Sequence, residues 1–444
     1  MPEKQIVDTL IHARWIVTVD AQQRILSDHS LAIDKGKIVA IEPSDQLSVQ
    51  SSNEVTLNDH ALMPGLINAH GHTPMTLFRG LADDLPLMEW LNDHIWPAEG
   101  RWVDEAFCLE GVELAMAEMI RSGTTCFSDM YFFPNVVAKA AAAANMRCQI
   151  TFPILDFPSN WASGADEYLR KGLQLHDDYR NHDLINIGFG PHAPYTVSDG
   201  PLKKVSTMAV ETNMPIQMHI HETAHEVEEA IQQTGMRPIE RLNELGLLTP
   251  QLQAVHMTQL TDDEITLLAQ TGTHVIHCPE SNLKLASGFC PVAKLLEAGV
   301  NVALGTDGAA SNNDLDLLGE MRTAALLAKG IAQNPAAVPA DQALAMATIN
   351  GAKALGIDHI TGSIEAGKAA DVIAINLSDI ACQPHYHLAS QLVYATPSSQ
   401  ITDSWIAGKR VMENRQLTTI ELKRILENAV QWKQKIQQAD EAPK

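Results

Sequence analysis

A histidine pair, His70-Gly71-His72, is the first feature of this sequence that could carry out chemistry. It follows an apolar run over residues 61–69. Alternate residues of a strand point to the same side, so both imidazoles would project together from the carboxyl end of such a strand. Neutral imidazole is the commonest metal-binding side chain. The pair therefore predicts metal ligands, with two hydrogen-bonded loop histidines as the alternative when the motif is taken alone.

Further histidines and carboxylates stand where other short apolar segments end. Together with the pair, the set is His70, His72, His192, His219, Glu222, His256 and Asp307. Any one of them could be a buried structural residue. The carboxyl ends of the strands in a (β/α) barrel, however, all lie at one face, where such barrels build their active sites. The sequence therefore predicts that these side chains meet at a single rim.

This set of side chains predicts a catalytic metal site. Three imidazoles and a carboxylate suit one divalent ion, zinc or ferrous iron, and leave room for a water ligand. Such an ion lowers the pKa of its bound water to near neutrality, which makes hydroxide available. Glu222 stands three residues after His219 and could move a proton without binding the metal. His256 and Asp307 would flank the hydroxide, so hydrolysis is the expected type of reaction.

The elements that would position these residues alternate between strand and helix. Helical patterns cover residues 106–121, 135–144 and 262–269, among others. The predicted strands are 62–69, 124–129, 148–154, 185–189, 215–219, 253–256, 274–278 and 300–306. This alternation is typical of a parallel sheet, and its length fits a TIM-type (β/α)8 barrel of the α/β class. An open doubly wound sheet is the alternative, but no Gly-rich phosphate loop follows the first strand.

Both ends of the chain have a different pattern, with short strands and turns. The predicted terminal strands are 6–10, 15–19, 29–33, 37–41, 372–376, 392–395, 401–406 and 410–412, with a hairpin turn at 34–37. A helix is expected over residues 419–438. We expect one small β-sandwich assembled from both termini, which divides the chain into residues 1–61, the barrel at 62–363, and residues 364–444.

The bulk composition restricts the possible partners. The chain has 444 residues, is 45% hydrophobic and carries a formal net charge of −23. Such a charge repels nucleic acids and anionic membranes, so a small-molecule substrate is expected. The six cysteines are scattered, and neither a leader-like segment nor an apolar run of membrane-spanning length is present. We therefore expect a cytoplasmic protein without a membrane partner.

Longer motifs reveal a resemblance to a known family. They occupy residues 64–80, 89–99, 190–196, 218–223, 278–288, 305–313 and 362–375. With them the sequence resembles the amidohydrolase superfamily, and most closely its branch of 5-methylthioadenosine/S-adenosylhomocysteine deaminases and related triazine hydrolases. The resemblance covers nearly the whole chain. It implies a metal-dependent hydrolase. A homo-oligomer is expected on separate grounds, because the helical exteriors of barrels commonly pair.

The resemblance also assigns roles to individual residues. It makes His70, His72, His219 and Asp307 the metal ligands, Glu222 the proton shuttle and His256 the partner of the nucleophilic water. It places Glu222, Asp307, Glu99, His192, Trp90 and Ser311 against the substrate, with Glu99 holding ribose hydroxyls. Trp90 could equally be a packed core aromatic. Binuclear relatives carry a lysine at the end of strand four, and its absence here implies a single metal ion.

The implied reaction is hydrolytic deamination at C6 of an adenine nucleoside, giving an inosine-type product and ammonia. Relatives that favour S-adenosylhomocysteine place arginines after strand three, and residues 148–169 contain none. Phe152, Phe157 and Trp161 offer apolar surface there instead. We therefore expect 5′-methylthioadenosine or adenosine to be preferred, with S-adenosylhomocysteine as a further candidate.

Two other functions are compatible with the same scaffold. One is deamination or dechlorination of a free heterocycle such as an s-triazine, guanine or a pterin, for which a ribose-binding Glu99 has no purpose. The other is a non-catalytic scaffold. Such proteins lose metal ligands, whereas this sequence keeps every expected ligand and the acid.

Overall fold

An eight-stranded parallel barrel forms the centre of the structure, a computed structural model that describes residues 5–440. Its strands follow chain order: β5 (Leu66–Asn68), β6 (Thr124–Asp129), β7 (Arg147–Ile154), β8 (Ile185–Pro191), β9 (Ile216–Ile220), β10 (Leu252–His256), β11 (His274–His277) and β12 (Val302–Leu304). The Ala69 amide donates a 2.9 Å hydrogen bond to the Leu304 carbonyl, which joins the first strand to the last. The predicted (β/α)8 barrel is therefore confirmed.

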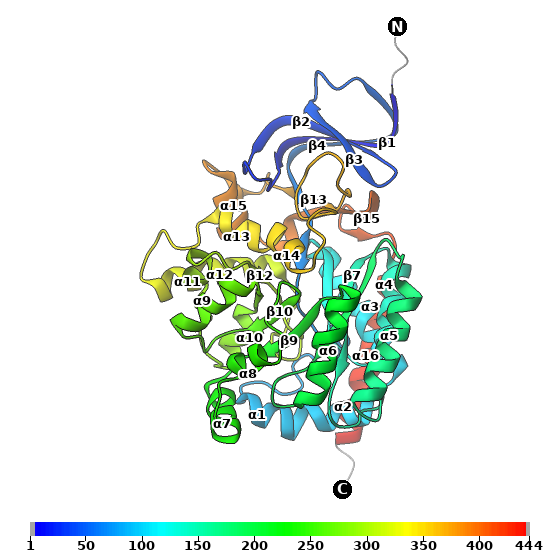
Figure 1. Cartoon of the computed structure of the whole chain (residues 1–444). Coiled ribbons are helices and arrows are strands. Elements are labelled where there is room, and N and C mark those ends of the chain that lie inside the picture. Colours follow the sequence, from blue (N-terminus) through cyan, green and yellow to red (C-terminus); the bar gives the residue numbers. More distant parts are fainter. Residues whose placement is uncertain (1–4, 441–444) are drawn as a thin grey trace.

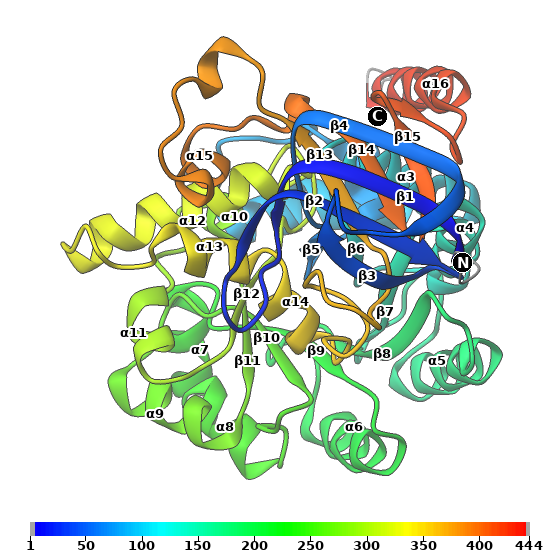
Figure 2. The same ribbon diagram turned by 90° about the horizontal axis from the view of Figure 1, so that it is seen from above.

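Helices surround these strands (Figures 1 and 2). They are α3 (Glu105–Arg121), α4 (Pro134–Ala144), α5 (Ala165–Tyr179), α6 (Asp199–Thr212), α7 (Ala224–Thr234), α8 (Pro238–Glu244), α9 (Asp262–Thr271), α10 (Pro279–Lys284), α11 (Val292–Glu297), α12 (Leu317–Ala332), α13 (Ala340–Met346) and α14 (Ile349–Ala354). The main apolar core lies between the helices and the barrel strands. The helices predicted at 106–121, 135–144 and 262–269 correspond to α3, α4 and α9.

Strands from both termini form a second, mixed sheet at one end of the barrel (Figure 1). They are β1 (Gln5–Val17), β2 (Ile25–Asp34), β3 (Lys37–Pro43), β4 (Val49–Pro64), β13 (Val372–Asn376), β14 (Ile401–Ile406), β15 (Lys409–Glu413) and β16 (Gln416–Leu417). Strand β4 pairs with β1 on one side and β13 on the other, which joins the two ends of the chain. The predicted turn at 34–37 connects β2 to β3.

The first predicted barrel strand, 62–69, is divided between the two sheets. Residues 62–64 belong to β4, and only Leu66–Asn68 form barrel strand β5. The change occurs at Gly65, where an added Cβ would lie 1.9 Å from Thr125 Oγ1. Pro64 has no amide hydrogen to donate, and the Gly65 amide donates to the Asp371 carbonyl. A continuous apolar run hides this change because both segments are buried.

Two predictions for the terminal regions were wrong in detail. The strands expected at 6–10 and 15–19 are one strand, β1, with an irregularity between Ala13 and Trp15. The strand expected at 392–395 is part of helix α15 (Leu388–Tyr394). The buried residues of α15 are Leu388, Ala389, Leu392 and Val393, a spacing typical of one helical face. A four-residue window is too short to reveal that period.

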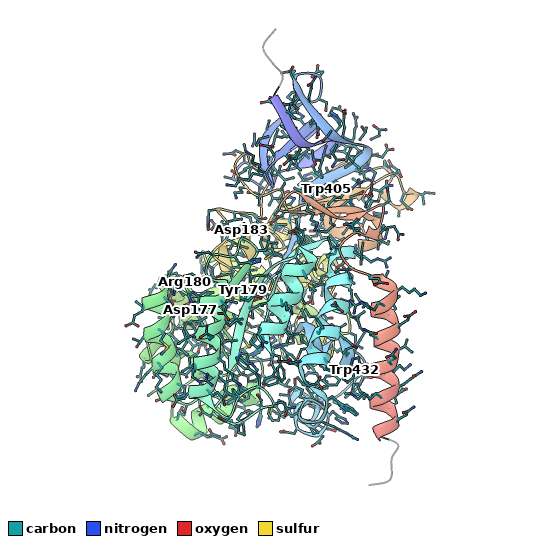
Figure 3. The ribbon with its side chains drawn as sticks, turned by 90° about the vertical axis from the view of Figure 1, so that its right-hand side faces the viewer. Asp177, Tyr179, Arg180, Asp183, Trp405 and Trp432 are labelled. Carbon is teal, nitrogen blue, oxygen red and sulfur yellow. The ribbon has the colours of Figure 1, made fainter. Side chains whose placement is uncertain are left out.

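The C-terminal helix α16 (Leu422–Asp440) stands alongside the barrel, with Trp432 towards it (Figure 3). Trp432 packs edge-on against Phe107 of α3, with ring centroids 5.2 Å apart, and its Nε1 donates to Glu110. The helix predicted at 419–438 is thus present, shifted by a few residues. Within residues 5–440, no helix is long and apolar enough to cross a membrane.

Candidate functional site

A cavity of ≈ 510 Å³ opens at the carboxyl ends of the barrel strands. The predicted site residues that line it are His72, Trp90, Glu99, His192, His219, Glu222, His256, Asp307 and Ser311. His70 is fully buried, and its ring lies 4.8 Å from that of His72 and 4.9 Å from that of His219. The structure therefore brings all the predicted site residues to one place.

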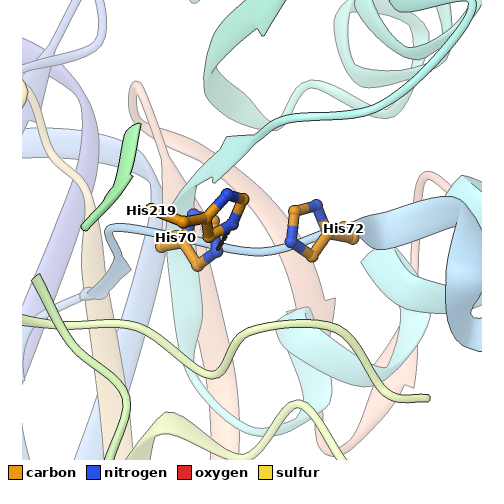
Figure 4. Close-up of side chains that lie close together, drawn as sticks. All are labelled: His70, His72 and His219. Atoms are coloured by element: carbon orange, nitrogen blue, oxygen red, sulfur yellow. Dashed lines mark hydrogen bonds between the residues drawn. The ribbon is translucent and has the colours of Figure 1, made fainter. Parts of the chain in front are cut away.

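Three histidines and one aspartate converge at the floor of this cavity. His70, His72 and His219 offer ligand atoms that all lie within 4.8 Å of one another (Figure 4). The His70 and His219 Nε2 atoms are 3.2 Å apart. Asp307 Oδ1 lies 3.4 Å from His70 Nε2 and 3.2 Å from His72 Nε2. Four donor atoms thus surround one point, as a mononuclear metal site requires.

The opposite nitrogen of each histidine is already engaged. Nδ1 of His72 lies 2.6 Å from the Met130 carbonyl oxygen, and Nδ1 of His219 lies 2.7 Å from the His192 carbonyl oxygen. Nδ1 of His70 lies 2.8 Å from Gln217 Oε1. Because these oxygens only accept hydrogen bonds, each Nδ1 carries a proton, and each Nε2 is the nitrogen left to bind a metal ion. That is the tautomer a metal ion needs, so the residues present fit a divalent cation.

Asp307 is held by two hydroxyl groups. Ser281 Oγ donates to its Oδ2 at 2.7 Å, and Ser311 Oγ donates to the same oxygen at 2.9 Å. Burial favours the neutral carboxyl, but hydrogen bonds from His70 and His72 hold the pKa of Asp307 well below its usual value. Its backbone has φ 60°, in the left-handed region that non-glycine residues seldom adopt. The contacts thus leave a carboxylate whose Oδ1 faces the histidines.

Glu222 lies near Asp307, but its protonation state differs from that of the Asp307 carboxylate. Its Oε2 is 3.6 Å from His256 Nε2. Burial raises the pKa of Glu222 to about 8, and the nearby Asp307 shifts it in the same direction. The side chain is therefore protonated at neutral pH and able to donate a proton. The His256 ring is fixed through Nδ1, 2.9 Å from Asn282 Oδ1, and its backbone has φ 75°.

Glu99 also lines the cavity. It belongs to α2 (Trp96–Trp102), which follows α1 (Leu87–Glu89) and a π-helical turn, η2 (Trp90–Ile95). Glu99 Oε1 accepts a 2.7 Å hydrogen bond from the Tyr131 hydroxyl. Burial raises the pKa of Glu99 to about 7. Trp90 is 6% exposed and packs with Leu91, so it is a core aromatic that also lines the cavity.

His192 lines the cavity as a neutral ring. Burial lowers its pKa to about 3, and the neighbouring histidines add to the effect. Its Nδ1 lies 3.0 Å from Thr196 Oγ1, and its backbone carbonyl accepts from His219. His192 therefore connects the lining of the cavity to His219 of the histidine cluster.

Comparison with known proteins identifies the family of the chain. The model of the amidohydrolase family matches residues 61–411 of the sequence. The chain belongs to the amidohydrolase family. A 5-methylthioadenosine/S-adenosylhomocysteine deaminase from Saccharophagus degradans is 55% identical over 98% of this chain and 98% of its own length. A 5′-deoxyadenosine deaminase from Methanothermobacter thermautotrophicus is 44% identical over 83% of this chain and 86% of its own length.

Solved structures of other proteins share the fold of this chain. An adenosine deaminase from Xanthomonas campestris with bound zinc is 47% identical, with a TM-score of 0.97 over 98% of this chain and 100% of that one. Atrazine chlorohydrolase from Arthrobacter aurescens is 23% identical and shares the fold, with a TM-score of 0.89 over 96% of this chain and 99% of that one. Family membership and the histidine cluster together support a metal cofactor.

Several residues that organise this amidohydrolase site were not predicted from the sequence. They are Gln217, Ser281, Asn282, Tyr131 and the Met130 carbonyl. Gln217 stands two residues before His219, on the same side of β9, which is a signal that could have identified it. Of the three aromatic residues expected near the 5′ substituent, Phe152, Phe157 and Trp161, only Phe157 lines the cavity. Phe152 packs in the core against Phe189, and Trp161 packs on Tyr168.

Replacing Gln217 by leucine should weaken metal binding by the amidohydrolase by about 10- to 100-fold, the usual effect of losing a residue that orients a metal ligand. Without Gln217 Oε1, His70 loses the acceptor that fixes its tautomer and ring plane. Metal affinity can be measured by competition with a chelator, for zinc and for ferrous ion. Gln149→Leu is the matched control, because Gln149 is equally buried in the same amide network but bonds to no histidine. Equal affinity in both variants would contradict this role for Gln217.

Proposed function

We propose that this amidohydrolase deaminates adenine nucleosides by hydrolysis, giving an inosine-type nucleoside and ammonia. The observation that carries the proposal is that two sets of functional side chains line one cavity. The same lining holds a candidate metal-binding group with a proton donor, Glu222, and a second carboxylate, Glu99, which is suited to ribose hydroxyls. The deaminase names of the relatives described above support the same reaction.

His70, His72, His219 and Asp307 would hold one divalent ion in this proposal. We favour zinc, with ferrous iron as the alternative, because three imidazoles and a carboxylate suit both ions. When bound, the ion supplies Lewis acidity that lowers the pKa of a water ligand and so provides a nucleophile at neutral pH. The engaged Nδ1 atoms keep the three Nε2 lone pairs directed at that point.

The protein's own acids and bases then have separate tasks. Attack at C6 places negative charge on the ring, and the protonated Glu222 is suited to deliver a proton to N1. Departure of ammonia requires a second proton, which the ionised Asp307 can accept from the nucleophile and pass to the amine. Proton transfers of this kind contribute about 10²–10⁴-fold each to a rate. His256 would stabilise the oxygen on the tetrahedral carbon. Its Nδ1 faces Asn282 Oδ1, which holds the ring in place and leaves Nε2 for this contact.

Substrate recognition would use the remaining lining residues. Glu99 accepts hydrogen bonds from ribose hydroxyls, His192 contacts the purine or the sugar, and Trp90 offers an apolar face. Ser311 acts through Asp307, to which it donates, as well as by lining the cavity. The cavity is within the range of volumes that small-molecule sites have.

The lining favours a nucleoside with a small, uncharged 5′ substituent. Among the described residues that line the cavity there is no lysine or arginine, while Leu155, Phe157 and Pro158 supply apolar surface. The amino-acid group of S-adenosylhomocysteine carries a carboxylate that needs a cationic partner. We therefore place 5′-methylthioadenosine and adenosine ahead of S-adenosylhomocysteine.

An ammonia-release assay tests the proposed function directly. We expect kcat/KM for 5′-methylthioadenosine and adenosine to exceed that for S-adenosylhomocysteine by at least about tenfold, the effect of one unpaired charge. Guanine and melamine should release no ammonia. The metal content of the same sample identifies the ion. A preference for S-adenosylhomocysteine would overturn the assignment of the 5′ end, and release from melamine or guanine alone would overturn the nucleoside proposal.

A free-heterocycle substrate remains the second candidate, and Glu99 separates it from the first. Glu99→Ala should lower kcat/KM for adenosine by about 10- to 100-fold, because hydrogen bonds to a charged group contribute about 1.5–3 kcal/mol. Activity on a free base would not depend on Glu99. Glu89→Ala is the control, since Glu89 ends helix α1, is exposed and does not line the cavity. An unchanged kcat/KM for adenosine in Glu99→Ala would favour the heterocycle.

A further inference from the structure

We propose that Tyr131 is a positioning residue for substrate recognition: its hydroxyl holds Glu99 in the orientation that receives the ribose hydroxyls. This inference rests on the proposed function of Glu99. Tyr131 follows strand β6 by two residues and is 4% exposed, and both side chains line the cavity. The Tyr131 hydroxyl donates to Glu99 Oε1 at 2.7 Å.

The hydrogen bond divides the tasks of the two carboxylate oxygens. A phenol has one proton, and here it is directed at Oε1. In the part of the chain that the structure describes, no protein group donates to the other oxygen, Oε2. Oε2 therefore keeps its lone pairs for donors that enter the cavity, and a vicinal diol supplies two such donors. Without the Tyr131 hydroxyl, the Glu99 carboxylate could rotate, and water could bind to either oxygen in place of the ribose hydroxyls.

The segment that carries Tyr131 also supports the metal-binding group. The Met130 amide donates to the Gly71 carbonyl at 3.0 Å, and the Met130 carbonyl accepts from His72 Nδ1. One residue earlier, Asp129 Oδ1 accepts from the Thr73 amide and hydroxyl, both at 2.6 Å. Four hydrogen bonds thus tie residues 129–130 to residues 71–73. The Tyr131 hydroxyl extends this connection to Glu99, so it fixes the distance between the ribose-binding carboxylate and the metal-binding group.

The ring and the hydroxyl of Tyr131 have separate environments, which show what each contributes. The Tyr131 ring packs in the apolar cluster around Trp90 and Phe107, and phenylalanine would fill that space equally well. Its hydroxyl has Glu99 as its hydrogen-bond partner. Burial and the neighbouring carboxylates of Glu99 and Asp129 raise the pKa of Tyr131 well above its usual value, so the phenol stays a donor. The hydroxyl is therefore explained by Glu99 and not by packing.

A double-mutant cycle combined with two substrates tests the inference. The enzyme, its Tyr131→Phe, Glu99→Ala and doubly substituted variants are loaded with zinc and assayed with adenosine and with 2′,3′-dideoxyadenosine. We expect Tyr131→Phe to raise KM for adenosine by about tenfold with little change in kcat, since a hydrogen bond to a charged group is lost. Tyr131→Phe should not change KM for adenosine in the Glu99→Ala background. It should also not change KM for the dideoxynucleoside.

The controls separate this inference from its alternatives. Tyr179→Phe removes a hydroxyl at the end of α5 (Figure 3) from a residue that does not line the cavity, and this variant should match the wild type. If Tyr131→Phe weakens activity equally in both backgrounds or on both substrates, its role is structural and the inference fails. No change in KM for adenosine also overturns it. Absence of ammonia release by the wild-type enzyme from either nucleoside would instead overturn the proposed function, and the inference with it.

Discussion

Glu222→Gln should lower kcat for adenine nucleosides by about 10²–10⁴-fold, the range by which a positioned general acid accelerates a reaction. Glutamine has nearly the same shape but no acidic proton to deliver to the ring. In the wild-type protein, burial beside Asp307 raises the pKa of Glu222 to about 8, which keeps the proton in place at neutral pH. Initial rates of ammonia release, measured with saturating nucleoside, give this ratio.

Metal content distinguishes loss of the acid from loss of the site. Glu222 is not among the four groups that surround the metal position, so the Gln variant should bind as much zinc as the wild type. KM should change less than kcat, because the proton is needed only in the transition state. Glu228→Gln, at an exposed position of α7, is the matched control. A Glu222→Gln enzyme with full metal and more than a tenth of the wild-type kcat would contradict the assigned role.

The positions of the site residues were predictable because strand ends in a barrel share one face. The histidine and aspartate candidates, His70, His72, His192, His219, His256 and Asp307, each follow an apolar segment of strand length, so their place at the rim follows from fold class alone. Glu99 lies outside this logic. It belongs to a helix between the first two barrel strands, and only the resemblance to a family indicated it.

The contacts that give these residues their chemical states were not predictable. Gln217 and His70 are separated by 147 residues, and Ser281 and Asp307 by 26. Which polar side chain of one strand meets a histidine of another depends on the register and tilt of the closed barrel. A sequence pattern fixes which face a residue occupies but not its partner. For the same reason, the bond between Tyr131 and Glu99 has no signature in the sequence.

The wrong predictions of individual strands have a related cause. A short apolar run predicts a strand, but this rule fails where a buried segment continues from one element into another or belongs to a helix. At Gly65 one sheet ends and the other begins within a single apolar run. In α15 the four apolar residues are buried on a helical period, and His387 accepts from the Ser390 amide at its start. Tertiary packing decided both cases.

Arg147→Met should destabilise the protein by about 3–5 kcal/mol, the usual cost of leaving a buried charge unpaired. Arg147 begins β7 and is 5% exposed, and its Nε donates to Asp371 Oδ2 at 2.7 Å. A second nitrogen donates to the carbonyl of Asp183, which Figure 3 labels near the junction with the terminal sheet. Asp371 precedes β13, is 2% exposed and accepts from the Ala407 amide. The pair therefore joins the barrel to the terminal sheet.

Thermal unfolding can be measured for Arg147→Met and for a double variant, Arg147→Met with Asp371→Asn. The comparison separates the loss of the ion pair from the cost of an unpaired, buried Asp371 carboxylate. The single variant should melt about 3–5 °C lower, because a chain of this length unfolds with an entropy near 1 kcal/mol per degree. Asparagine keeps an acceptor for the Ala407 amide but carries no charge, so the double variant should regain most of the loss. Equal melting temperatures for the single variant and the wild type would show that the buried pair does not hold the sheet to the barrel. Since Arg147 lies at the amino end of β7, opposite the catalytic rim, kcat at 25 °C should not change in either variant.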